Sequence, residues 1–148
     1  GCFLIAVDTN LLVYAHRREM PLHNRACELV GQLATGSQRW GIPDACLHEF
    51  YAIVTNQRAF SPPSTTGQAV DQVNAWLESP ACRVLHSTTE HWPVLSHLAS
   101  SAALMGGQIY DARIAAICLE NGVTELWTAD RDFARFPALK SRYPLPQA

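Results

Sequence analysis

The sequence predicts a three-layer α/β fold, in which a mostly parallel sheet of four to five strands lies between two layers of helices. The first observation is a continuous apolar run at Phe3–Val7, which is typical of a strand buried on both faces of a parallel sheet. The second is the alternation of short apolar runs with longer segments of helical period. The third is an ordinary globular composition, 48% hydrophobic and 16% charged over 148 residues.

Length and composition predict one globular domain over residues 1–148 and exclude disordered, collagenous and disulfide-scaffold classes. No apolar run approaches the roughly 20 residues that cross a bilayer, so no membrane association is expected. The cysteines are odd in number and include no closely spaced pair, which favours a reduced, cytoplasmic setting over a secreted one. They are Cys2, Cys27, Cys46, Cys82 and Cys118.

The remaining elements follow in order along the chain. After the first strand a helix begins near Leu11, and an apolar stripe from Leu22 to Leu33 predicts the next helix. Further strands are expected at 40–42, 82–85 and 125–128. Helices are expected at 44–55 with Asp44 as N-cap, around 70–77, at 89–104 and at 110–120, the last ending at Asn121-Gly122. The tail from about 141, which contains two prolines, is expected to be loosely structured.

Four acidic residues break the pattern of these elements. Asp8 ends the buried first strand, and Asp130 follows the last predicted strand by two residues. Glu49 and Asp111 each lie on an apolar stripe of their helix, at the spacing i, i+3, i+4, i+7. A buried, unpaired carboxylate is costly, so such positions need a partner. The alternative for Asp8 and Asp111 is helix capping, and for Asp130 a turn.

The four carboxylates are expected to lie at one edge of the sheet. Ligands of open parallel sheets bind at the carboxyl ends of the strands, where Asp8 and Asp130 fall, and Asp111 and Glu49 can face the same edge. An oxygen-rich pocket without paired lysines suits Mg²⁺, with Mn²⁺ as a substitute, better than zinc.

The net charge of -2 first argues against a nucleic-acid partner, since most such proteins are basic. Without the four clustered acids, nine acidic residues face eleven basic ones, so the rest of the chain carries +2. A mildly basic surface around a metal site is therefore compatible with RNA binding.

Four motifs resemble those of PIN-domain nucleases, in the expected order from near the start of the chain to about Pro137. They are VDTNLLVYA at 7–15, HEF at 48–50, YDARIAA at 110–116 and WTADRDF at 127–133. The branch they resemble most is the VapC toxins of bacterial toxin–antitoxin pairs.

The resemblance implies a Mg²⁺-dependent endoribonuclease that leaves a 3′-hydroxyl and a 5′-phosphate, acting on a structured RNA such as a tRNA or a ribosomal loop. Asp8, Glu49, Asp111 and Asp130 would be the catalytic, metal-holding acids. Thr9, Asn10 and Thr128 would orient them, whereas Asp132 is not expected to be a ligand. Arg113 and Arg131 are candidates for RNA contact, with surface ion pairs as the alternative.

The same resemblance implies two partners, a VapB-type antitoxin and a second copy of the chain. The antitoxin would need an apolar groove, for which the candidate wall residues are Leu11, Leu12, Tyr14, Trp76 and Trp92. The alternative is that they belong to the core, which is the more common place for aromatic residues at helical spacing. Three alternatives remain open: a non-catalytic PIN-like RNA- or protein-binding module, a metal-dependent DNA nuclease, and a receiver domain. Receivers carry a lysine on a late strand, and Lys140 lies in the terminal segment instead.

Overall fold

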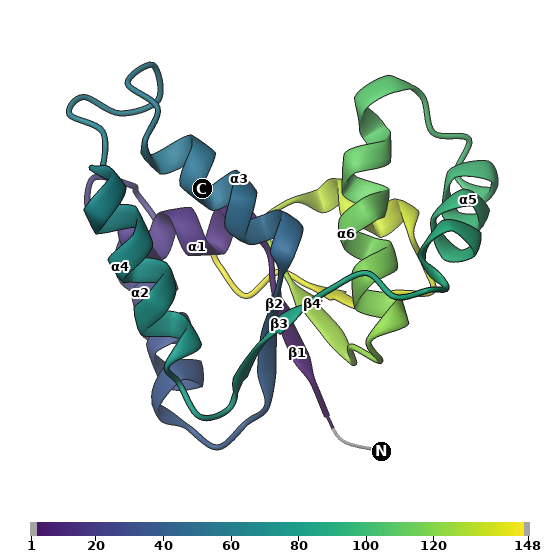
Figure 1. Cartoon of the computed structure of the whole chain (residues 1–148), viewed down its shortest axis with the longest axis horizontal. Helices are drawn as coiled ribbons and strands as arrows, with labels where there is room; N and C mark the ends of the chain where they lie inside the picture. The colour runs from purple at the N-terminus through teal and green to yellow at the C-terminus, as the bar shows by residue number, and fades with distance from the viewer. Residues whose placement is uncertain (1–2, 147–148) are drawn as a thin grey trace.

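A five-stranded parallel sheet forms the centre of the structure, a computed structural model that describes residues 3–146 (Figure 1). Neighbouring strands are parallel throughout, in the order β3-β2-β1-β4-β5, so the predicted fold class is confirmed. Cys2 and positions 147–148 of the expected tail lie outside the described residues. The strands are β1 (Ile5–Val7), β2 (Trp40–Pro43), β3 (Cys82–Leu85), β4 (Glu125–Trp127) and β5 (Ser141–Arg142).

Helices cover both faces of this sheet. In Figure 1 α1, α2 and α4 lie on one side of the strands, and α5 and α6 lie on the other. Helix α3 contacts α1, α4 and α6 and thereby connects the two layers. The helices are α1 (Thr9–His16), α2 (His23–Thr35), α3 (Asp44–Val54), α4 (Thr66–Leu77), α5 (His91–Ser101) and α6 (Ile109–Glu120), with short 3₁₀ helices η1 (Gly106–Gln108) and η2 (Arg131–Arg135).

Strand β1 lies at the centre of the sheet, which explains its continuous apolar sequence. It pairs with β2 on one edge and β4 on the other, and all three of its residues are buried. Strand β2 needs a glycine, because a Cβ at Gly41 would lie 2.8 Å from the side chain of Leu85. The central strand therefore brings Asp8, the next residue, to a fixed position at the carboxyl edge.

Residues 141–146 include a strand, where a loose tail is expected from about 141. Ser141 and Arg142 form β5 and pair with Leu126 and Trp127 of β4. Glu125 of β4 is 3% exposed, and its carboxylate lies 3.5 Å from Lys140 Nζ and 3.4 Å from Arg142 Nη1. These ion pairs, together with buried side chains before and after β5, hold the segment against the sheet although it contains two prolines. Those buried side chains are Phe133, Phe136, Leu139 and Leu145.

Each predicted helix is present, but several helix ends differ by a few residues from the prediction. Asp44 is the first residue of α3 rather than its N-cap, and its Oδ1 accepts the N–H of Ala45 at 2.7 Å. Helix α5 is shorter than expected, because its N-cap is Glu90 and its C-cap Ala102. Helix α6 ends as predicted, with Gly122 at φ +70° directly after it, a conformation that favours glycine.

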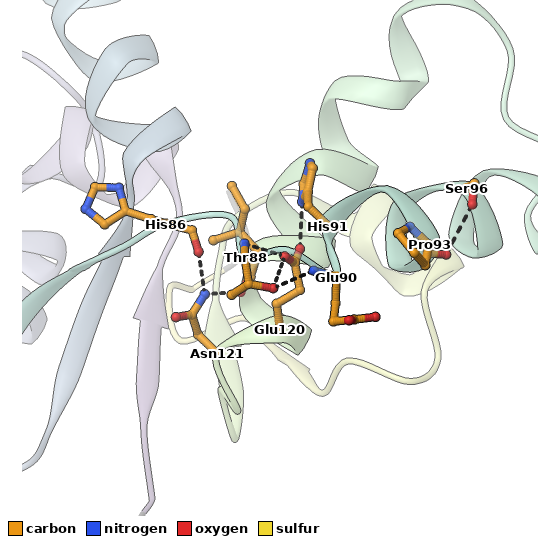
Figure 2. A network of polar contacts seen from close by, with 9 residues as sticks. His86, Thr88, Glu90, His91, Pro93, Ser96, Glu120 and Asn121 are labelled. Atoms are coloured by element: carbon orange, nitrogen blue, oxygen red, sulfur yellow. Dashed lines mark hydrogen bonds and ion pairs between the residues drawn. The ribbon is translucent and has the colours of Figure 1, made fainter.

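A buried carboxylate fixes α5 and its preceding loop to the end of α6 (Figure 2). The side chain of Glu120 is 0% exposed, and its Oε1 accepts the N–H of Thr88 at 2.8 Å and the hydroxyl of Thr88 at 2.9 Å. Its Oε2 lies 2.6 Å from Nδ1 of His91, and Nδ2 of Asn121 donates to the carbonyl of His86 at 2.8 Å. The network braces α6, whose first turn carries Asp111.

Three of the five residues expected to line an antitoxin groove belong to the core instead. Leu11, Leu12 and Trp76 are buried, because α1 packs against α2 and α3 and Trp76 packs edge-on against Phe50. Tyr14 is half-buried, and Trp92 is 69% exposed on α5. Within residues 3–146 no helix has both the length and the apolar character that a bilayer crossing requires.

Candidate active site at the carboxyl edge of the sheet

The acidic residues gather where the parallel strands end. Asp8 follows β1 directly, and Asp130 follows β4 after a two-residue turn. Because both strands run the same way, their last residues lie at one edge of the sheet. Glu49 reaches this edge from the middle of α3 and Asp111 from the first turn of α6.

Asp8 is the most deeply buried of the predicted acids, at 4% exposure. Its Oδ2 accepts the hydroxyl of Thr128 at 2.7 Å, and its Oδ1 accepts the thiol of Cys46 at 3.6 Å. Burial raises the pKa of Asp8 to about 6, although the Thr128 hydrogen bond favours the ionised form and opposes the shift. Asp8 occupies the N-cap position of α1 without making a side-chain capping bond, so capping does not explain it.

Glu49 is held between the two helices that flank the site. Its Oε2 accepts the hydroxyl of Thr9 at 2.9 Å, and its Oε1 lies 3.2 Å from Nη2 of Arg113. The side chain is 36% exposed, so one part of it faces solvent while its oxygens meet α1 and α6. The inward stripe on α3 thus predicts the direction of Glu49 correctly.

Asp111, Asp130 and Asp132 form the tightest acidic group. Each offers one carboxylate oxygen, and these oxygens lie within 4.8 Å of one another. Burial raises the pKa of Asp111, and the charges of Asp130 and Asp132 raise it further. Asp130 also caps η2, because its Oδ1 accepts the N–H of Asp132 at 2.9 Å.

Asp132 is the residue that sequence reasoning set aside. Its one signal in the sequence is its place in the WTADRDF motif, and the packing of η2 against α6 brings its carboxylate close to those of Asp111 and Asp130. Asp8 and Glu49 lie outside this trio. The charge of Glu49 nevertheless raises the pKa of both Asp8 and Asp111, which places Glu49 in electrostatic contact with each.

The donor set fits a divalent cation. The site offers carboxylate oxygens that repel one another, and a hard cation such as Mg²⁺ or Mn²⁺ takes this type of ligand. Burial and, to a smaller extent, the charges of neighbouring acids raise the pKa of Asp8 and Asp111, so the negative charge of these carboxylates is imperfectly balanced by the surrounding residues. A bound cation would remove that imbalance.

Two of the three predicted orienting residues make the expected kind of contact. Thr9 donates to Glu49, and Thr128, which is fully buried, donates to Asp8 and accepts the N–H of Asp130 at 2.9 Å. Asn10 is half-buried in α1 and makes no side-chain hydrogen bond within residues 3–146. The two threonines therefore tie the acids to the ends of the strands.

Both arginines proposed for RNA contact lie beside the acids. Arg113 pairs with Glu49, and its guanidinium carbon lies 5.2 Å from the ring centroid of Tyr110. Arg131 is stacked over Tyr143 at 4.0 Å. A third arginine that the sequence did not single out, Arg135, lies 3.5 Å from Asp132.

Known proteins resemble this chain over nearly its full length. The PIN domain family matches residues 5–139. Ribonuclease VapC43 of Mycobacterium tuberculosis is 41% identical over 142 residues, which cover 96% of each chain.

Two solved structures of lower identity share the fold. VapC20 of Mycobacterium tuberculosis, described as a sarcin-ricin loop cleaving toxin, has a TM-score of 0.64 at 19% identity and covers 88% of this chain and 92% of its own. VapBC2 from Rickettsia felis, bound to a DNA fragment from its promoter, has a TM-score of 0.66 at 18% identity, with 95% and 98% covered.

Proposed function

The chain belongs to the PIN-domain family and, within it, to the VapC ribonucleases, and from this membership we propose that it is the toxin of a toxin–antitoxin pair that cuts structured RNA with the help of Mg²⁺. The observation that carries the proposal is the set of acids at the carboxyl edge of the sheet, three of which converge within 4.8 Å. We also propose that the protein acts in the cytoplasm, where such an RNA substrate is available.

Five carboxylates are available to hold the metal. Asp8, Glu49, Asp111 and Asp130 are the ligands that the motifs indicate, and the geometry adds Asp132. When bound, Mg²⁺ lowers the pKa of a coordinated water and offsets the charge that develops on the phosphate. Hydrolysis of the phosphodiester then leaves a 3′-hydroxyl and a 5′-phosphate.

The other site residues position these acids and meet the substrate. Thr128 holds Asp8 in one orientation, and Thr9 does the same for Glu49. Arg113 lies 3.2 Å from Glu49, and its planar guanidinium is a group that could also bind a phosphate of the RNA. Arg131 follows Asp130 directly in the chain and is the second arginine that we propose for RNA contact.

A structured RNA is favoured as the substrate, since VapC20, which shares this fold, is described as cleaving the sarcin-ricin loop. The partner we propose is a VapB-type antitoxin that blocks the acidic edge. The VapBC complex from Rickettsia felis, bound to its promoter DNA, supports a pair of this kind. A homodimer of the chain is the second proposed assembly.

The test is cleavage of total RNA by the purified protein, with Mg²⁺, with Mn²⁺ or with EDTA. We expect discrete fragments with 5′-phosphates in the presence of metal and none with EDTA. Asp8→Asn should abolish cleavage, whereas Asp71→Asn, an exposed acid on α4, should leave it unchanged.

Other outcomes separate the alternatives. Cleavage by Asp8→Asn at the wild-type rate would contradict the site assignment. Cleavage of DNA in place of RNA would support a DNA nuclease, and binding of RNA without cleavage under either metal would support a non-catalytic module.

A further inference from the structure

A second hollow adjoins the acidic edge, and none of the proposed metal-holding acids lines it. It is a cavity of about 340 Å³, formed by segments that follow β1, β4 and β5. We name it the tyrosine pocket. Its lining includes Tyr14, Leu22, Thr128, Arg131, Tyr143 and Leu145.

One residue belongs to both the tyrosine pocket and the acidic site. The hydroxyl of Thr128 donates to Asp8 at 2.7 Å and accepts the N–H of Asp130 at 2.9 Å, while Thr128 also lines the pocket. Arg131 follows Asp130 directly in the chain. A group bound in the pocket would therefore lie next to a phosphate bound at the acids.

The chemistry of the lining favours a flat aromatic ligand. The guanidinium of Arg131 is stacked on the ring of Tyr143 at 4.0 Å, and Tyr14 supplies a second aromatic ring. Leu22 and Leu145 add apolar surface. Unpaired bases of RNA bind to aromatic rings and to the plane of arginine in this way.

Charge distinguishes this pocket from the larger hollow that begins at the last residue of α1. That hollow is lined by two acids, Glu19 and Asp71, and by two arginines, Arg17 and Arg18, so its lining carries no net positive charge, and Arg17 is already paired with Glu19 at 2.7 Å. Among the described residues that line the tyrosine pocket, none is acidic and one is an arginine. Its volume is near the lower limit of about 300 Å³ for small-molecule sites, so it suits one ring system rather than a folded segment.

We propose that the tyrosine pocket receives one unpaired base of the RNA substrate, adjacent to the bond that is cut. This inference rests on the proposed ribonuclease activity and adds a substrate-binding subsite to it. It implies that a structured RNA is cut where a neighbouring nucleotide is already unpaired, since extracting a paired base costs stacking energy.

The experiment scans a cleaved RNA hairpin with abasic nucleotides. Each loop nucleotide is replaced in turn, and kcat/KM is measured with Mg²⁺. We expect one abasic position, within one nucleotide of the cut, to lower kcat/KM of the wild type by about 5- to 150-fold, the loss that corresponds to one stacked base.

Variants then connect that position to the pocket. Arg131→Ala, at an exposed position, and Tyr143→Leu should each lower kcat/KM for the intact hairpin and make it insensitive to the abasic change. Tyr143→Phe keeps the ring and should behave as the wild type. Tyr51→Leu, on α3 outside the pocket, is the matched control and should retain full sensitivity.

Each outcome decides the matter. Non-additive losses in Arg131→Ala and Tyr143→Leu, with rescue by Phe, support the subsite. Additive losses would overturn the subsite alone. The same holds if no abasic position lowers kcat/KM in a hairpin whose cleavage requires Asp8. In either case the pocket is assigned to a protein side chain instead of a base. No metal-dependent cleavage of any RNA overturns the proposed function and the subsite together.

Discussion

At the scale of single residues, the burial of Asp8 sets the electrostatics of the site. Its carboxylate is ionised at neutral pH in a place that excludes water, and its pKa is raised to about 6 from 3.8. A group whose pKa is higher in the folded state than in the unfolded state destabilises the fold once pH exceeds both values. Without a bound cation, ionised Asp8 therefore lowers the free energy of unfolding at neutral pH.

Asp8→Asn should accordingly stabilise the metal-free protein while it abolishes cleavage. At pH 7.5 we expect the free energy of unfolding to rise by roughly 1–3 kcal/mol, and the gap to shrink as pH falls from about 6 toward 4. Urea unfolding at several pH values measures it. Asp71→Asn is the control, and a gap that does not change with pH would count against the explanation.

Thr128 is the residue whose hydroxyl matters most to Asp8. Thr128→Val keeps the shape but removes the donor to Asp8 and the acceptor for Asp130, so the pKa of Asp8 should rise further. We expect kcat/KM to fall about 10-fold or more, with the acid limb of the pH–rate profile moved to higher pH. Thr128→Ser should retain wild-type behaviour, and equal profiles for the Val and Ser variants would refute this role.

The four predicted acids could be found from sequence because each contradicts the pattern of its own element. Asp132 could not be found in this way, since it lies in a polar turn where an acid is ordinary. Its proximity to Asp111 arises from tertiary packing of η2 against α6, which no local pattern encodes. The groove residues Leu11, Leu12 and Trp76 failed for the opposite reason, because an apolar stripe does not reveal whether a partner or the core covers it.

At the scale of elements, β5 is a strand that the sequence pattern does not predict. Two residues are too few to display a period, and the prolines that follow suggested a loose tail. What fixes β5 is a buried acid on the adjacent strand: the carboxylate of Glu125 accepts the indole N–H of Trp127 at 2.9 Å and pairs with Lys140 and Arg142. Burial alone would raise the pKa of Glu125, but these partners outweigh it and lower the pKa.

Glu125→Gln tests whether the ion pairs of Glu125 with Lys140 and Arg142 stabilise the fold. Since the pKa of Glu125 is lowered in the folded state, its contribution is present above the ordinary value of 4.5 and is lost as pH falls below it. We expect a loss of about 1–3 kcal/mol in unfolding free energy at pH 7 and a smaller loss at pH 4. Urea titrations measure both.

Glu28→Gln is the control, because Glu28 forms an exposed pair with Arg25 on α2 and should change stability by at most about 0.5 kcal/mol. Equal effects of the two variants would show that burial of Glu125 does not matter.

At the scale of the whole molecule, the formal charge conceals two regions of opposite sign. Acids from four separate parts of the chain meet at one edge, and the remaining surface is mildly basic. A divalent cation that binds only the folded protein should stabilise it by about 2.7 kcal/mol at a hundred times its Kd.

Thermal unfolding with and without Mn²⁺ measures this stabilisation. Asp111→Asn should remove most of it, and Asp132→Asn should weaken Mn²⁺ affinity about 10-fold if Asp132 belongs to the site. Asp71→Asn should match the wild type. Full Mn²⁺ stabilisation of Asp132→Asn would remove that residue from the site.

Cys46, whose thiol donates to Asp8 at 3.6 Å, offers a way to follow the acidic edge by chemical labelling. Burial raises the pKa of Cys46 well above its ordinary value, and only a thiolate is alkylated efficiently. Cys46 should therefore react only when the edge opens, much later than the half-buried Cys27 and Cys82. Its rate of alkylation then reports the opening of the candidate site, and a metal or an antitoxin that closes this edge should slow the reaction without any RNA present.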